Sequence, residues 1–313
     1  MGQYVSGPTI AAMTSLTAVV PATNSPPTLA ACLDAIRRAD APPEQIVVVS
    51  EGGRPANARN AGAADATGDV LVFVDADVLP HADAFVRIRR AFDADPELMA
   101  LFGSYDDDPA DSGVVSGFRN LLHHHVHHES AGRVTTFWTG LGGVRRTAFV
   151  DLGGFEPAMR YMEDVEFGMR LHRAGGRIVL DPSIQGQHLK AWTLPSMVRT
   201  DLVARGIPWV ELLFRHPEAP AALNLGWRHR LSAGASLVVA LGLLRRRPAL
   251  AVAGVAGLVV LNRSFYRLLA ERRGPAEATA GVALHVVHHL VGVAAVPAGT
   301  VRYLCRASPQ RPS

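Results

Sequence analysis

The chain has 313 residues, enough for one large domain with an appended region, and its formal net charge is only +3 at pH 7. Hydrophobic residues make up 48% of it and the mean hydropathy is +0.14, which is apolar for a soluble enzyme. The apolar excess lies after about residue 230, beside arginines between Arg199 and Arg273, and this favours a membrane surface as a partner. No nucleic-acid recognition motif is present, and two distant cysteines exclude a disulfide framework.

The first half of the chain alternates apolar strand patterns with helical patterns. We expect a strand at 16–21, a helix at 28–39, a strand at 46–49, a helix at 59–64 and a strand at 71–74. Further on, we expect a helix, a strand and a helix at 82–92, 98–103 and 117–129, then a strand, a helix and a strand at 135–138, 162–171 and 178–181. This order is typical of an α/β domain with ligand residues at strand ends.

Two carboxylates end the apolar run 71–74. If the strand continues through them, Asp75 and Asp77 lie on the same side of it, because side chains alternate along a strand. Paired hard oxygen donors suit Mg²⁺ or Mn²⁺ and, through the metal, a diphosphate. The alternative is that the two acids only cap the turn that follows.

A second acidic pair, Glu163 and Asp164, begins the helix expected at 162–171. Acids in a first turn are stabilised by the helix dipole, which is a structural explanation for them. The same position would keep a carboxylate ionised, as a general base requires. His188 follows the last expected strand, where it could reach the metal edge.

Five histidines between His123 and His128 fall on one expected helix. Their four-residue spacings can bind a transition metal, but no second group of ligands accompanies them. A polar, pH-sensitive helix face is the more usual meaning of such a cluster.

The last third of the sequence predicts basic interfacial helices at 196–230 and then apolar helices at 231–305. The basic stretch, which begins at Leu194, is anchored by tryptophans and broken by four prolines: Pro195, Pro208, Pro217 and Pro220. Segments 231–244 and 248–261 would each be about 21 Å long, short of a hydrocarbon core of ~30 Å. We therefore expect them to form a shallow hairpin with Arg245–Arg247 on the cytoplasmic face. Segment 278–300 is long enough to span a membrane, and a soluble helical subdomain is the alternative for this region.

Domain limits follow from these patterns: an N-terminal extension (1–15), the α/β domain (16–195), the interfacial helices, the apolar helices and a tail (306–313). The N-terminus lacks a signal-peptide pattern, and arginines precede Leu231. By the positive-inside rule we expect a cell-membrane protein with a cytoplasmic catalytic domain.

In the order in which they occur, five short motifs give residues 15–195 a resemblance to family 2 glycosyltransferases of the GT-A fold, especially membrane-associated bacterial members. The motifs are Val19–Ala22, Ala58–Gly62, Phe73–Asp77, Gly153–Phe155 followed by Glu163–Asp164, and Gln187–Leu194. The resemblance implies a Rossmann-like domain that uses a nucleoside-diphosphate sugar and a divalent metal, Mg²⁺ or Mn²⁺.

The resemblance also implies residue roles. Pro21, Ala22 and Glu51 would line the nucleotide-base pocket, with Arg59 near base or phosphate. Asp75 would face ribose and metal, Asp77 would bind the metal, and His188 would be a further metal or diphosphate contact. Asp164 would be the base that deprotonates the acceptor hydroxyl, and Glu163 would shape the acceptor site. The segment Ser50–Gly52 departs from the family's usual Asp-Gly-Ser, so the nucleotide is not identified.

A single base and a single displacement predict inversion at the anomeric carbon. The acceptor is expected at the membrane, as a lipid-linked or amphipathic molecule in contact with membrane lipids. Two alternatives stay open: a nucleotidyltransferase of related fold, and a membrane-anchored protein that binds sugar nucleotides without catalysis. The segment Ala22–Pro26 lacks the Gly-rich basic loop of the first, and the second has no need of Asp164 as a base.

Overall fold

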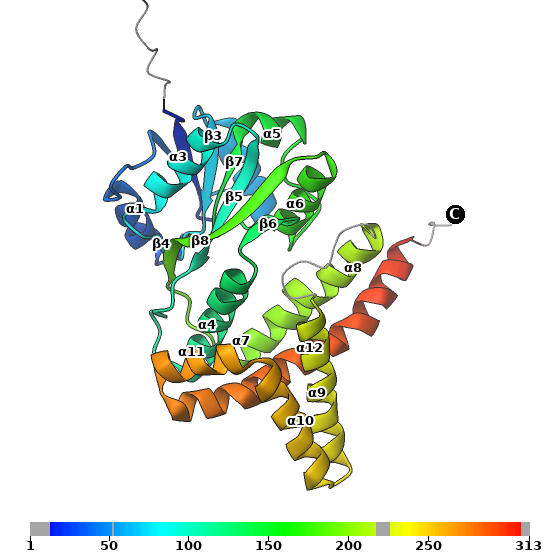
Figure 1. The fold of residues 1–313 in the computed structure, drawn as a ribbon. Helices are drawn as coiled ribbons and strands as arrows, with labels where there is room; N and C mark the ends of the chain where they lie inside the picture. The colour runs from blue at the N-terminus through cyan, green and yellow to red at the C-terminus, as the bar shows by residue number, and fades with distance from the viewer. Residues whose placement is uncertain (1–12, 52, 217–225, 308–313) are drawn as a thin grey trace, which may run out of the picture.

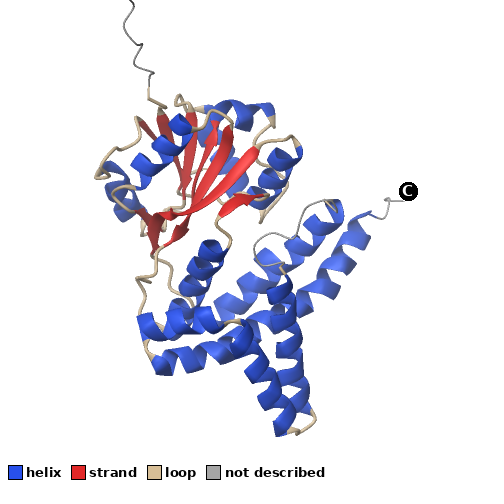
Figure 2. Cartoon of the chain, viewed as in Figure 1, coloured by secondary structure: helices blue, strands red, loops and turns tan. Residues whose placement is uncertain are grey.

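The computed structural model describes residues 13–51, 53–216 and 226–307. Most of the expected N-terminal extension, residue 52 of the Ser50–Gly52 motif, Pro217, Pro220 and the end of the tail lie outside these ranges. The chain forms an α/β domain from which a group of long helices projects on one side (Figures 1 and 2).

The α/β domain is built on one mixed sheet of order β2-β1-β3-β7-β5-β8-β4, with β6 (Gly132–Val134) paired to β8. The strands β2 (Gln45–Val49), β1 (Leu16–Pro21) and β3 (Val70–Val74) are parallel neighbours. They are connected through α1 (Leu29–Arg37) and α2 (Pro55–Ala64). The carboxyl ends of these three strands therefore share one edge, as the sequence predicted.

The strand β7 (Leu141–Arg145) lies antiparallel between β3 and β5 (Leu98–Tyr105). The prediction of a strand at 135–138 was wrong, because these residues form an irregular loop and the strand starts at Leu141. Two glycines, Gly142 and Gly143, lie within β7. A Cβ on Gly142 would lie 2.3 Å from the carbonyl oxygen of Trp138, so only glycine lets that loop fold over β7.

The strand β8 (Arg177–His188) is much longer than the predicted 178–181. It runs parallel to β5 and ends antiparallel to the short β4 (Val78–Pro80). His188 is therefore the last residue of the strand, opposite Val78, and not a residue of the following loop. This pairing places His188 directly beside the Asp75–Asp77 turn.

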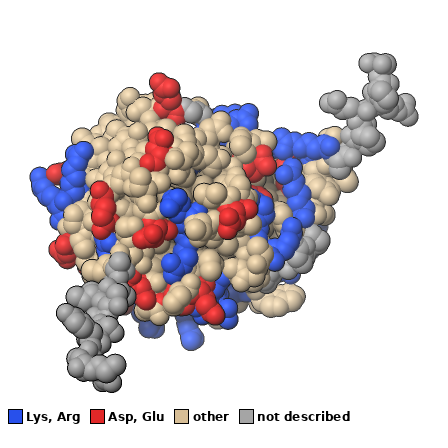
Figure 3. Space-filling model, turned by 90° about the horizontal axis from the view of Figure 1, so that it is seen from above, with Lys and Arg blue, Asp and Glu red and all other residues tan. Residues whose placement is uncertain are grey.

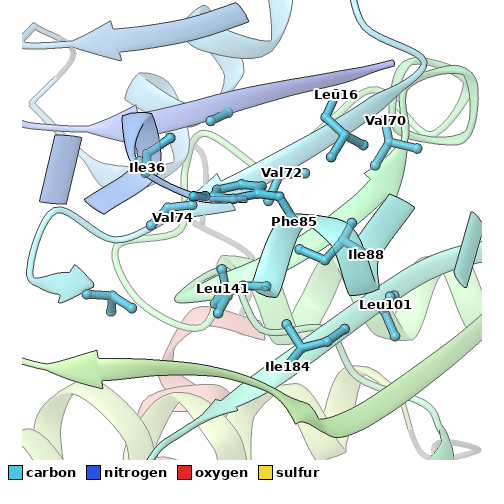
Figure 4. Packing of buried hydrophobic residues seen from close by; sticks show 14 of the residues in the cluster. Leu16, Ile36, Val70, Val72, Val74, Phe85, Ile88, Leu101, Leu141 and Ile184 are labelled. Atoms are coloured by element: carbon cyan, nitrogen blue, oxygen red, sulfur yellow. The ribbon is translucent and has the colours of Figure 1, made fainter. Parts of the chain in front are cut away.

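Side chains that alternate along the central strands pack into two hydrophobic cores, one on each face of the sheet. On one face, Val70, Val72 and Val74 pack with α1 and α3 (Ala84–Ala94) in the cluster of Figure 4. On the other face, β3 contributes Leu71 and Phe73, which pack under α2, α5 (Arg146–Asp151) and α6 (Glu163–Arg173). Five phenylalanines contact one another there: Phe73, Phe137, Phe149, Phe155 and Phe167. This aromatic core fixes the start of α6 against the sheet.

The helix α4 (Val114–Glu129) lies between the sheet and the C-terminal helices (Figure 1). The helices α7 (Leu194–Arg199) and α8 (Ile207–Arg215) are joined without a break by the π-helical segment η1 (Thr200–Gly206). Pro195 and Pro208 therefore do not interrupt this segment as expected. Pro195 lies in the first turn of α7, where a proline costs no hydrogen bond, and Pro208 lies just after the π-helical segment.

The helices α9 (Trp227–Leu244) and α10 (Pro248–Leu261) pack as a hairpin with Arg245–Arg247 at its tip. A Cβ on Gly242 would lie 2.4 Å from the Ala251 backbone, so small residues bring the helices close together, as in membrane helix pairs. The chain continues through α11 (Arg263–Arg273), bent 81° from α10, into α12 (Pro275–Ala307). By length and composition, Pro275–Arg306 is a candidate membrane span among the described helices, and the bent pair is a second if it counts as one span.

The surface of the α/β domain seen from above carries acidic and basic side chains side by side (Figure 3).

Candidate functional site

The two central aspartates lie in the turn that joins β3 to β4. The prediction that they share one side of an extended strand was wrong, because β3 ends at Val74 and the Asp75 carbonyl accepts a turn hydrogen bond from the Val78 amide at 2.9 Å. Their side chains are 30% and 35% exposed and engage different neighbours, Asp75 contacting Arg59 and Asp77 facing His188. Both carboxylates therefore stay accessible at the sheet edge while being held from opposite sides.

Arg59 connects three elements of the site. Its guanidinium donates to Asp75 Oδ1 at 2.7 Å and to Glu163 Oε1 at 2.5 Å, and only 6% of the residue is exposed. Small residues of α2 let this helix pack close to β1, since a Cβ on Gly62 would lie 2.5 Å from Val19. The Ala58–Gly62 motif thus places a buried cation between the turn and α6.

Glu163 and Asp164, the first two residues of α6, have different surroundings. Glu163 is 5% exposed and points to Arg59. Asp164 is less buried, and its Oδ2 accepts from the amide and hydroxyl of Thr139, each at 3.3 Å. Its other oxygen accepts from the Val165 amide at 2.8 Å. The loop 135–140 thus orients Asp164, whereas Glu163 belongs to the buried charge network.

Negative charge is in excess at this edge. Burial and the neighbouring Asp164 raise the pKa of Glu163 to about 7, although Arg59 acts in the opposite direction. Burial also raises the pKa of Asp75, with Asp77 and Asp164 adding to the effect against Arg59. Burial alone would raise the pKa of Asp77 as well, but His188 and Lys190 lower it. Four carboxylates outnumber the cations Arg59 and Lys190, so the site favours a bound cation.

His188 has the surroundings of a metal ligand. Its Nδ1 lies 2.7 Å from Asn120 Oδ1, so the Nδ1–H donates to that oxygen and Nε2 is the nitrogen that faces the site. Nε2 lies 3.5 Å from Asp77 Oδ2. The ring of Tyr105 stacks on the imidazole with centroids 4.1 Å apart, which fixes its orientation. Asp77 and His188 thus present a carboxylate oxygen and an imidazole nitrogen side by side at the sheet edge.

The residues expected to bind the nucleotide base follow β1 and β2. Pro21 ends β1, and the Ala22 amide donates to the Val49 carbonyl at 2.8 Å. Glu51 is exposed just beyond β2. These residues share the sheet edge with Asp75 but do not contact the Arg59 network in the part of the chain that the structure describes.

Three supporting residues were missed in the sequence: Asn120, Tyr105 and Thr139. Each lies far along the chain from the residue it orients, so no local pattern points to it. Lys190 was visible inside the Gln187–Leu194 motif, and its ammonium lies 4.2 Å from the Trp192 ring centroid.

The α4 histidines are neither a polar face nor a metal site by their surroundings. His124 and His127 point Nδ1 at the backbone carbonyls of Tyr105 and Gly103, at 2.9 and 3.0 Å. Burial lowers the pKa of His125 to about 4 and of His127 to about 3, so both are neutral at physiological pH. His124 and His127 pack α4 against β5, and this corrects the expectation of a pH-sensitive face.

Residues 46–153 match the family described as Glycosyl transferase family 2. The fold is similar to that of the mannosyltransferase PcManGT from Pyrobaculum calidifontis, solved in complex with GDP-Man and Mn²⁺, at 18% identity and a TM-score of 0.53 over 95% of this chain and 88% of that one. The structure of S. aureus TarS 1–349 has 15% identity to this chain and a TM-score of 0.45, covering 90% of each chain. The comparison with curated proteins gives no match.

Proposed function

Since this chain carries a family 2 glycosyltransferase domain of the GT-A fold, as expected, we propose that it is a metal-dependent, inverting glycosyltransferase. It moves a sugar from a nucleoside-diphosphate sugar to an acceptor hydroxyl at the membrane. The observation that carries this proposal is the convergence of Asp75, Glu163 and Asp164 around Arg59 at the carboxyl edge of β1 and β3, with Asp77 next to Asp75. Neither a nucleotidyltransferase nor a binding protein needs this arrangement with a separately oriented Asp164.

Asp77, Asp75 and His188 are the residues that would hold Mg²⁺ or Mn²⁺. The excess of carboxylates and the position of His188 Nε2, 3.5 Å from Asp77, support this set, and PcManGT was solved with Mn²⁺. When bound, such a cation supplies positive charge to the departing diphosphate. Asp75 is tied to Arg59 and so stays oriented toward ribose and metal, while Asp77 is the more ionised of the two.

Asp164 is the proposed base. The acceptor oxygen attacks the anomeric carbon, the bond from that carbon to the diphosphate oxygen breaks, and Asp164 takes the hydroxyl proton. One displacement inverts the anomeric configuration. The hydrogen bonds from Thr139 and the Val165 amide support this role, because they hold an ionised carboxylate in one orientation. The burial of Glu163 against Arg59 favours a positioning role for it over direct contact with the acceptor.

Pro21, Ala22 and Glu51 would line the base pocket, with Arg59 on its phosphate side. Their shared position at the ends of β1 and β2 supports this assignment. The long apolar α12 and the exposed apolar side chains of α9 and α10 support an acceptor delivered from the membrane, such as a lipid-linked or amphipathic molecule. The catalytic domain would face the cytoplasm.

A donor screen tests the proposal. Nucleoside-diphosphate sugars are incubated with the purified protein with and without Mn²⁺, and release of the nucleoside diphosphate is measured. We expect one donor class to be hydrolysed only with metal. Asp77→Ala should lose both turnover and the Mn²⁺-dependent part of nucleotide binding by calorimetry, since it removes a hard ligand from a site with few. Full activity of that variant at limiting metal would overturn the metal assignment.

A further inference from the structure

Three histidines meet where α9 contacts α12, far from the catalytic edge in sequence. His229 begins α9, and His288 and His289 lie side by side on α12. One nitrogen from each ring lies within 4.8 Å of the others. The rings of His229 and His289 are in contact, with centroids 4.6 Å apart. Small rotations of these side chains bring three nitrogens to the ~2.0–2.1 Å that Zn²⁺ requires.

His289 needs a partner that the protein does not supply. The residue is 2% exposed, and within the described part of the chain neither of its ring nitrogens has a hydrogen-bond partner. A neutral imidazole has one N–H and one lone pair, and leaving both unpaired in a buried place is unfavourable. A bound cation satisfies one nitrogen directly.

His288 is already oriented as a ligand. Its Nδ1 lies 2.8 Å from Asp201 Oδ2, so the carboxylate accepts the Nδ1 proton and leaves the Nε2 lone pair free. Arg119 of α4 pairs with the other oxygen of Asp201 at 2.7 Å and keeps that acid ionised. A carboxylate behind a ligating histidine is the usual outer shell of a metal site.

Beside these histidines is a cavity of about 370 Å³, lined by both His229 and His288. His125 and His285 also line it, so its wall is rich in imidazole. A metal held by three protein ligands would leave its fourth position open to this space, where water can bind.

We propose that His229, His288 and His289 form a second metal site, which binds a Zn²⁺-class transition-metal cation and joins α9 to α12. Three neutral imidazoles select Zn²⁺ over Mg²⁺ or Mn²⁺, which prefer oxygen ligands. The site is thus distinct in chemistry from the carboxylate-rich catalytic edge. Through Asp201 and Arg119 it also connects the helical region to α4, on which the α/β domain rests.

The test uses the full-length protein in detergent without a histidine tag. The protein is stripped with chelator, titrated with Zn²⁺, and its melting temperature is followed. Asp77→Ala is used as the background, so that binding at the catalytic edge does not contribute. We expect one Zn²⁺ per chain and a rise in melting temperature. Titration with Co²⁺ should give the visible absorption of a four-coordinate site with nitrogen ligands.

Variants assign the ligands. His229→Gln and His289→Gln should each weaken Zn²⁺ binding at least 100-fold, and Asp201→Asn about 10–100-fold by releasing His288. His172→Gln, an exposed histidine on α6, is the matched control and should bind as before. Unchanged Zn²⁺ affinity in both ligand variants would overturn the proposal. So would a parent protein that binds no Zn²⁺ or gives only the octahedral Co²⁺ spectrum, and this result does not depend on the folding of any variant.

Discussion

Individual side chains decide the proposed chemistry, and Asp164 decides most of it. In Asp164→Asn the amide oxygen still accepts from Thr139, so we expect a stability loss of only ~0.3–1 kcal/mol from the lost charge at the helix start. Donor and Mn²⁺ binding should stay normal while turnover falls about 10²–10⁴-fold. Calorimetry and a single-turnover assay separate the two effects.

Asp151→Asn, an exposed acid on α5, is the control for Asp164→Asn and should leave the rate unchanged. Near-normal turnover of Asp164→Asn would remove the base from the mechanism.

Glu163 makes stability depend on pH. Its pKa is about 7 in the folded protein and near the ordinary 4.5 when unfolded, so between these values the native state holds more protons. The free energy of unfolding should therefore fall as the pH rises from about 4.5 through 7. Urea denaturation of wild type and Glu163→Gln at pH 5 and 8 measures this, and the fall should be smaller in the variant. An equal fall in both proteins would show that Glu163 is not the group responsible.

Among single residues, the position of Asp75 after a strand and of Glu163 and Asp164 at a helix start could be predicted from the sequence, but their surroundings could not. The apolar run before Asp75 predicted a strand end, yet the turn that separates Asp75 from Asp77 depends on the pairing of Val78 with His188 across β4 and β8. That pairing joins residues 110 positions apart, and no local pattern encodes it. Asn120 and Thr139 stayed hidden for the same reason.

At the scale of elements, the parallel strands and their crossover helices were predictable from periodicity. The loop 135–140 was not, because Phe137 and Trp138 have strand-like side chains while their backbone is set by contact with α6. A Cβ on Gly168 would lie only 2.2 Å from the Phe137 amide nitrogen. Close packing between a helix and a loop leaves little mark in sequence beyond a single glycine.

Gly168→Ala tests the importance of that contact. The added methyl group should push α6 away from the loop and lengthen the hydrogen bonds between Asp164 and Thr139. We expect turnover to fall at least 10-fold with much less change in donor affinity, because the Arg59–Asp75 pair lies on other elements. His172→Ala on the exposed face of α6 serves as the comparison. A variant with normal turnover would show that α6 need not be held so closely.

For the whole molecule, composition predicted an apolar C-terminal region, and the helices α9–α12 are there. Their packing partners were not predictable, since the hairpin of α9 and α10 depends on small residues such as Gly242 and Gly254 meeting backbone. Two histidines of α12 contact neighbouring elements: His289 meets His229 of α9, and His288 meets Asp201 of η1. These contacts explain why an apolar helix tolerates them.

Topology is tested with a cysteine at Arg246, in a Cys305→Ser background because Cys305 is exposed while Cys32 is buried. We expect an impermeant thiol reagent added to intact cells to leave this position unlabelled and to label it after permeabilisation, as the positive-inside rule requires. A cysteine at His172 reports the side of the catalytic domain and should behave the same way. Labelling of position 246 from outside would place the hairpin tip across the membrane.

The π-helical segment η1 has a consequence for the length of the chain itself. It adds a residue to a helix that contacts α12 both within the segment and beyond it: Asp201 of η1 meets His288 at 2.8 Å, and Glu211 of α8 meets Arg302 at 2.7 Å. Because the wider π-helical turn absorbs the extra residue, deletion of one residue there would restore ordinary α-helical turns and keep α8 in phase with α12. This stretch should therefore tolerate the deletion of its exposed Val203 better than the insertion of a residue beside it, which would turn the α8 contacts by about 100°.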